Sequence, residues 1–246
     1  MKKIILSIAI ASILGVCSPT EIIAKTPEKT AILLPINNTN DQRTAELLWN
    51  NLSTNIYEHD HNKLISPEKT KVLIQGAGYS FGDQLTQLDS PEKRIALQNK
   101  MGTDGLIFIT VDDVNVSLKK NPLKPTTIKN IKGKAVLYVD GIEEKEFNIE
   151  GIETEKISGT ALKTILIIAG SIATDHNGLA TVASIAAISD PVIRGEVIDG
   201  VLALSGPLGN KIETLLFEKG ILKENPYKKA IDNAVASVAE DIEKNI

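Results

Sequence analysis

The sequence has little of several residue types on which common functions depend. Its 246 residues include a single cysteine, Cys17, so no disulfide can form within the chain and the fold must depend on its hydrophobic core. It has only three histidines, and no serine stands in a nucleophile-elbow sequence. The residues therefore predict a protein that is not an enzyme and that holds no cofactor.

Aromatic residues, positive charge and long apolar runs are also scarce. Aromatic residues make up 4% of the chain, and the formal net charge is −4. Nucleic-acid binding needs a basic face and often aromatic stacking platforms, so nucleic acid is excluded as a main partner. The apolar runs stay shorter than the ~20 residues that a membrane-spanning helix needs.

The first residues have the pattern of an export signal. Met1, Lys2 and Lys3 give a positively charged start, and an apolar run of 13 residues follows from Ile4 to Val16. That length suits the core of a signal peptide. We therefore expect residues 1–17 to direct the chain out of the cytoplasm, with the polar residues 18–30 as a tether.

The end of this leader resembles the lipobox of bacterial lipoproteins, because Leu14 stands three residues before Cys17. Val16 departs from that pattern, which has Gly, Ala or Ser directly before the cysteine. The resemblance implies lipidation of Cys17 and an anchor at the periplasmic face of the outer membrane. The alternative is cleavage after Ala24, which would release a soluble periplasmic protein.

The remaining sequence predicts one α/β domain over residues 31–246, with a mixed β-sheet and flanking helices. Strands are expected at 31–36, 71–74, 106–116, 130–139 and 144–149, with Asp140 and Gly141 as a hairpin turn. Helices are expected at 42–59 and, after a Ser90-Pro91 start, up to Met101. An amphipathic helix is expected after Asn225-Pro226.

Two Ala- and Gly-rich apolar segments, 161–174 and 178–189, stand apart from this pattern. Small side chains such as Gly170 and Ala183 allow helices to approach closely. The segment 161–189 is expected to be helical, either as core or as a surface for oligomerisation or membrane contact.

Three short patterns have residue types that occur in binding sites. The glycine-rich run Gly76–Gly82 lacks the glycine spacing of a dinucleotide loop and is interpreted as a turn after a strand. Asp112 and Asp113 lack a third carboxylate at a telling spacing, and the histidines of His59–His61 lack partner ligands. No metal site is predicted.

Two blocks carry a family pattern: the opening strand Ile32–Pro35 with Asn37 and Asn38, and the segment Lys100–Val111 with its "helix, Gly-x-Asp-Gly, strand" order. They resemble a family of Gram-negative envelope lipoproteins related to CsgG-like and TolB amino-terminal-like domains. The resemblance covers roughly residues 30–190. It implies a periplasmic α/β domain tethered to the outer membrane, and it carries over no catalytic residues.

Together these observations favour a non-enzymatic envelope lipoprotein. We expect an accessory or assembly component of a secretion, transport or wall-maintenance complex, which binds other envelope proteins or a second copy of itself. The alternative is a soluble periplasmic protein that binds a small ligand, or a minor enzyme, using the loop Gly76–Gly82.

Overall fold

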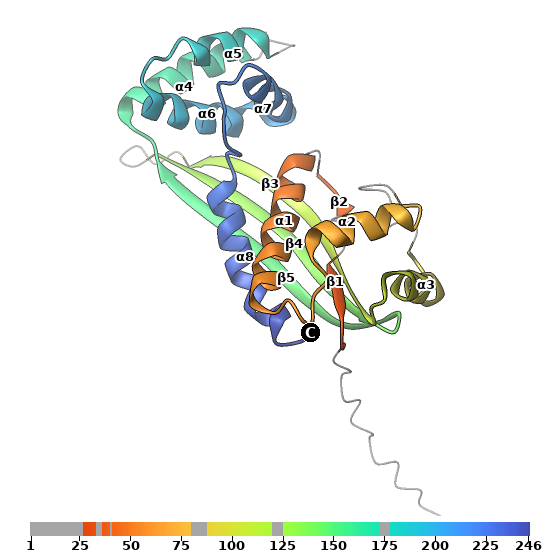
Figure 1. Ribbon diagram of the computed structural model, residues 1–246. Coiled ribbons are helices and arrows are strands. Elements are labelled where there is room, and N and C mark those ends of the chain that lie inside the picture. Colours follow the sequence, from red (N-terminus) through yellow and green to blue (C-terminus); the bar gives the residue numbers. More distant parts are fainter. Residues whose placement is uncertain (1–26, 33–35, 40, 80–87, 120–124, 173–177) are drawn as a thin grey trace, which may run out of the picture.

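The computed structural model describes residues 27–32, 36–39, 41–79, 88–119, 125–172 and 178–246. Cys17 and the predicted leader lie outside these residues. The described chain forms a mixed β-sheet with flanking helices, as the sequence predicts, with a separate group of helices beyond one end of the sheet (Figure 1).

The sheet has the order β1-β3-β4-β5, and β2 also pairs with β3. The short strands β1 (Thr30–Ile32) and β2 (Ile36–Asn37) run parallel to β3 (Gly105–Lys119). The long strands β3, β4 (Thr126–Val139) and β5 (Ile142–Lys156) form an antiparallel meander. Asp140, with a positive φ of 48°, and Gly141 make the predicted turn between β4 and β5.

A bulge in β3 keeps one face of this strand apolar along its whole length. Ile107, Ile109 and Val111 are fully buried, and Asp112 is then left without a partner opposite β4. After this extra residue, Val114 and Val116 point to the same side of the sheet as Val111 and pack against the core. The bulge approaches Gly133 of β4, where a Cβ atom would lie 2.1 Å from the carbonyl oxygen of Thr110.

Helix α1 (Gln42–His59) and helix α8 (Lys228–Glu243) pack side by side over this apolar face (Figure 1). The side chain of Asp41 caps α1 by accepting a hydrogen bond from the Thr44 backbone N–H. Trp49 of α1 is buried and donates its indole N–H to the Ile32 carbonyl oxygen at 3.1 Å. The predicted helices at both places are therefore confirmed.

Helix α2 (Pro67–Gly76) corrects one prediction, since residues 71–74 were expected to form a strand. A short apolar run does not by itself distinguish a strand from a buried helix segment. The Ser66 side chain accepts a hydrogen bond from the Lys69 backbone N–H, and Pro67 occupies the first helical turn. The same serine–proline start opens α3 (Pro91–Met101), which ends before Gly102, as predicted. Gly102 adopts the left-handed conformation that commonly ends a helix.

Helices α4 (Gly159–Ile172), α5 (Leu179–Ala186), α6 (Pro191–Ser205) and α7 (Gly209–Glu218) form a second packing unit, with the 3-10 turn η2 (Gly206–Leu208) between the last two. Their buried side chains make a hydrophobic cluster distinct from the one on the sheet. We call α4–α7 the helical group, and β1–β5 with α1, α2, α3 and α8 the sheet group. The predicted helical character of 161–189 is confirmed at 161–172 and 179–186, whereas a single domain over 31–246 stays a prediction.

In the described part of the chain, every helix is too short or too polar to cross a bilayer. Figure 1 places the helical group and the first described residues at opposite ends of the molecule. The C-terminus lies at the same end as β1.

The bulge gives a first prediction. In the Gly133→Ala variant, the new methyl group meets a backbone oxygen that cannot move without disturbing β3, so we expect a loss of about 2–3 kcal/mol in the free energy of unfolding. The control is Gly195→Ala in α6, which is exposed and has no atom within 4 Å of its added Cβ, and should gain up to about 1 kcal/mol. Urea unfolding measures both, and equal effects would contradict the packing described here.

Candidate functional site

A cleft of about 700 Å³ lies where the helical group meets the sheet group. Strands β4 and β5 supply one side, the first half of α6 supplies another, and the segment before α8 closes it. The charged side chains in its lining are Lys129, Glu155, Lys156, Glu196, Asp199 and Glu224.

Lys129 is the centre of the charge cluster beneath this cleft, and only 7% of its side chain is exposed. Its Nζ atom lies 2.9 Å from Asp199 Oδ2, 3.5 Å from Glu153 Oε2 and 3.6 Å from Glu155 Oε2. Glu153 and Asp199 are also almost fully buried. One cation therefore holds together two strands and a helix of the other group.

The pairing of β4 with β5 places Lys129 and Glu153 on the buried face of the sheet. Lys129 of β4 stands directly opposite Glu153 of β5, on the face that carries Ile131 and Ile149 further along the two strands. Val116 of β3, the neighbour of Lys129 on its other side, packs against both hydrophobic clusters. The charge cluster therefore lies at the point where the two cores meet.

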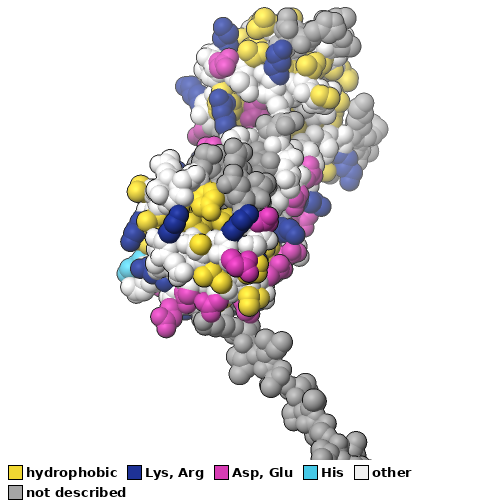
Figure 2. Space-filling view, turned by 90° about the vertical axis from the view of Figure 1, so that its right-hand side faces the viewer, with side chains coloured by type: hydrophobic (Ala, Val, Ile, Leu, Met, Phe, Trp, Pro, Cys, Tyr) yellow, Lys and Arg dark blue, Asp and Glu magenta, His cyan; other side chains and the backbone are white. Residues whose placement is uncertain are grey.

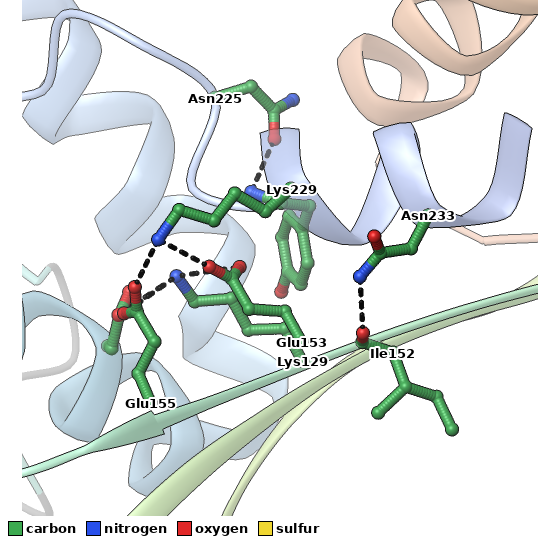
Figure 3. A network of polar contacts seen from close by, with 9 residues as sticks. Lys129, Ile152, Glu153, Glu155, Asn225, Lys229 and Asn233 are labelled. Atoms are coloured by element: carbon green, nitrogen blue, oxygen red, sulfur yellow. Dashed lines mark hydrogen bonds and ion pairs between the residues drawn. The ribbon is translucent and has the colours of Figure 1, made fainter. Parts of the chain in front are cut away.

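Helix α8 adds a second lysine from outside (Figure 3). Lys229 Nζ lies 2.9 Å from Glu155 Oε1 and 3.2 Å from Glu153 Oε1. One turn further on, Asn233 donates a hydrogen bond of 2.7 Å to the Ile152 carbonyl oxygen, which belongs to the outermost strand of the sheet. These contacts fix the start of α8 against the edge of β5.

Burial and neighbouring charge shift the pKa values in opposite directions. Burial raises the pKa of Asp199 to about 7 despite the nearby Lys129, and its hydrogen bond with Glu155 also raises it. Although partial burial opposes it, the hydrogen bond from Lys229 helps to lower the pKa of Glu155. Burial works against the charge of Lys129, but Asp199 and the two glutamates raise the pKa of this lysine. The carboxyl pair Asp199–Glu155 thus shares one proton near neutral pH.

These charge pairs are better suited to holding the helical group on the sheet group than to catalysis. A lysine acts as a nucleophile only when it is deprotonated, and both lysines here are held protonated by carboxylates. Groups of three or more side chains with metal-ligating geometry are absent from the described residues. The arrangement binds the helical group to the sheet through charge pairs.

The structure separates the site residues considered from the sequence. Cys17 and residues 80–82 of the glycine-rich loop lie outside the described residues. Gly76 ends helix α2, so the expectation that this loop follows a strand is wrong, and Gly78 has a φ of 90°. None of the described loop residues lines the cleft.

The acidic and histidine patterns occupy ordinary structural positions. Asp112 sits in the β3 bulge and accepts a hydrogen bond of 2.8 Å from the Asn38 side chain, whereas Asp113 accepts one from Asn115. His59 lies 3.7 Å from Glu243 at the end of α1, and His61 contacts the ring of Tyr57.

The sequence reasoning missed the residues of the buried cluster. One signal was available in the sequence. Lys129 lies two residues from Ile131, and Glu153 lies four residues from Ile149, so both charged residues fall on the side of their strands that carries buried apolar residues. A charged residue at an inward position calls for a buried partner. The identity of that partner, Asp199 from α6, depends on the tertiary fold.

Comparisons with known proteins give limited similarities. No protein-family model matches the chain, and no curated protein matches it at a significant level. Lipoprotein GNA1162 from Neisseria meningitidis is 17% identical, with a TM-score of 0.42, over 56% of this chain and 92% of its own. LpoB from E. coli is 14% identical, with a TM-score of 0.37, over 52% of this chain and 57% of its own.

The C-terminal domain of LpoB from Salmonella enterica is 15% identical, with a TM-score of 0.36, over 52% of this chain and 85% of its own. These similar structures come from Gram-negative bacteria, and one of them is named a lipoprotein. Since every TM-score is below 0.5, none establishes a common fold or function for this chain. The resemblance to CsgG-like and TolB amino-terminal-like domains stays a prediction.

Removal of the central lysine tests the energetics of the cluster. In Lys129→Ala, Asp199 stays buried without its cation and Glu153 keeps only Lys229, so we expect a loss of about 3 kcal/mol in unfolding free energy. The matched control is Lys132→Ala on the same strand, whose pair with Glu150 is about half exposed and should contribute less than about 1 kcal/mol. Urea titration at pH 7 measures both, and similar losses would refute the central role of Lys129.

Proposed function

We propose that this chain is an exported, non-enzymatic envelope protein, anchored to the outer membrane through a lipid at Cys17. Its role is that of an accessory or assembly component that binds other envelope proteins in a secretion, transport or wall-maintenance complex. The observation that carries the proposal is an exposed apolar surface on the helical group.

The exposed large apolar side chains of the helical group, which we call the apolar face, are Leu166 and Ile167 of α4, Leu179 of α5 and Val192 of α6. Their exposed fractions are 54%, 76%, 54% and 68%. They are four of the eight large hydrophobic residues exposed in the described chain, yet they lie between positions 166 and 192. Figure 2 shows hydrophobic side chains at the surface of this upper part of the molecule.

The chemistry around the apolar face favours a protein partner. On α4 and α5, Lys163 is the only charged residue, so a partner that approaches these two helices meets almost no charge that it must desolvate. Exposed small residues on α5, such as Ala180 and Ala183, allow another helix to approach closely. Clustered apolar exposure of this kind marks interaction surfaces in soluble domains.

The position of the helical group also fits a tethered protein. The described chain begins at the end of the molecule opposite to the helical group (Figure 1). A lipid at Cys17 would therefore hold the β1 end near the membrane and leave the apolar face free for a partner.

The lipid anchor is tested by intact mass of protein extracted from membranes. We expect a lipid-sized addition on a chain that starts at Cys17, and its loss in the Cys17→Ser variant. An unmodified chain that starts near Lys25 would instead show cleavage after Ala24 and contradict the anchored form. It would favour the soluble ligand-binding alternative.

The apolar face is tested by introducing a charge at its most exposed residue. Ile167→Glu should weaken complex formation at least about 10-fold, because a buried unpaired carboxylate opposes association, while thermal unfolding stays unchanged. The measurement is native electrophoresis of detergent extracts. The matched control is Val72→Glu on α2, at 66% exposure, which should keep the complex. Complexes that survive in Ile167→Glu would rule out the apolar face.

A further inference from the structure

The helical group and the sheet group meet at a narrow junction. Their buried apolar residues form separate clusters, and the chain passes between them at Ile157–Ser158 and again along residues 219–227. Helix α6 makes the main contact, lying against β3 and β4. Because few apolar side chains bridge the two cores, the polar groups at the junction have a large influence on how firmly the groups hold together.

Two buried carboxyl groups of the helical group face the sheet group across this junction. Asp199 of α6 faces Lys129 of β4, Glu153 and Glu155 of β5, and, through the shared glutamates, Lys229 of α8. In the ionised state it would be the third carboxylate around two ammonium groups. In the protonated state it gives its proton to the hydrogen bond with Glu155.

Glu213 of α7 is the second carboxyl group, and only 6% of it is exposed. It faces Asp41 and Arg43 from the start of α1 and Tyr227 from the start of α8. The guanidinium of Arg43 lies over the ring of Phe217 of α7, 4.5 Å from its centre, so this cation is shared with an aromatic partner. Burial raises the pKa of Tyr227, and the negative charges of Glu213, Asp41, Asp199 and Asp113 raise this pKa further.

Cavities lie on both sides of Glu213. One of about 200 Å³ is lined by Asp41 and Arg43, and another of about 170 Å³ is lined by Val116 of β3 and by Tyr227. Each is larger than the ~30 Å³ that one water molecule occupies in the liquid. Water can therefore reach an ionised carboxylate at this position once the junction loosens.

The electrostatic environment gives both groups the same sign of pH dependence. Burial raises the pKa of Glu213 to about 8, with Asp41 acting in the same direction and Arg43 against it. The pKa of Asp199 is raised to about 7, chiefly by burial. Carboxyl groups freed from the junction titrate near pH 4, so opening releases protons above that pH.

We propose that Asp199 and Glu213 form a proton-operated latch between the helical group and the sheet group. When protonated, Asp199 is hydrogen-bonded to Glu155 of β5 and Glu213 stays buried without a charge, so the helical group stays on the sheet. When ionised, Asp199 is the third carboxylate around the two ammonium groups of Lys129 and Lys229, and Glu213 places a negative charge beside Asp41, so the helical group separates more readily. The latch does not depend on which partner occupies the apolar face.

The direction follows from proton linkage. The stabilisation is complete below about pH 4 and is lost as pH rises to about 7 at Asp199 and about 8 at Glu213. Within that window, each proton released on opening changes the opening equilibrium by about 10-fold per pH unit. Mildly acidic conditions therefore close the junction and mildly alkaline conditions loosen it.

Hydrogen exchange of the full chain between pH 5 and pH 8.5 tests the latch. After correction for intrinsic exchange, protection of α6 and α7 amides should fall at least about 100-fold across this range, whereas β3 and β4 amides should change much less. Constant protection in α6 and α7 would overturn the proposal. An equal fall in both groups would also overturn it, because protonation would then stabilise the whole fold.

Variants that mimic the protonated state give the second measurement. The double variant Asp199→Asn with Glu213→Gln should keep α6 and α7 protected at pH 8.5, at least about 10-fold above the unmodified chain, with a flat pH profile. The control is Asp241→Asn on the exposed side of α8, which should follow the unmodified chain. A double variant that also follows the unmodified chain would refute the latch. If it fails to fold, the pH profile of the unmodified chain decides.

Discussion

The pairing of β3 with β4 is the contact on which the rest of the structure depends. Both hydrophobic clusters draw on β3, because this strand extends over 15 residues and presents apolar side chains on one side along its length. A strict alternation would turn Val114 and Val116 outward after Val111. The extra residue at Asp112 restores them to the inner side, and Gly133 makes room for the bulge. One continuous sheet can then support α1 and α8 at one end and α6 at the other.

The buried charges occur where these two cores meet, and this position explains their properties. An apolar residue at position 129 would have joined the clusters into one core. Lys129 instead requires carboxylates from both groups, and the cohesion of the junction becomes sensitive to charge. Charge pairs fix geometry more specifically than apolar contacts do, so the helical group has a defined place over the sheet. They also allow the environment to alter that contact, which apolar packing would not.

Different parts of the sequence were informative to different degrees. Helix α1, helix α3 and the hairpin at Asp140 followed from short-range signals, namely a capping side chain, a helix-ending glycine and a tight turn. Helix α2 was mistaken for a strand although Ser66 and Pro67 carry the same start signal as Ser90 and Pro91. The start of α6 had such a signal too, since Asp190 caps it and Pro191 follows, but no helix was predicted there. The residues that start α2 and α6 were therefore recognisable in the sequence, but the apolar residues that follow them did not indicate a helix.

The sequence by itself predicted an export signal, and it determined the mixed α/β class and most helix and strand types, because these depend on residues close together along the chain. Only the tertiary structure decided that Lys129 meets Asp199, 70 residues further on, and that Glu213 lies against the start of α1. Such contacts form between surfaces that many elements position jointly, and no local pattern encodes them. The division of the apolar residues of 161–189 between core and exposed face was likewise set by packing against α6 and α7. The same residue types occur on both sides of these helices, so composition alone could not distinguish the two.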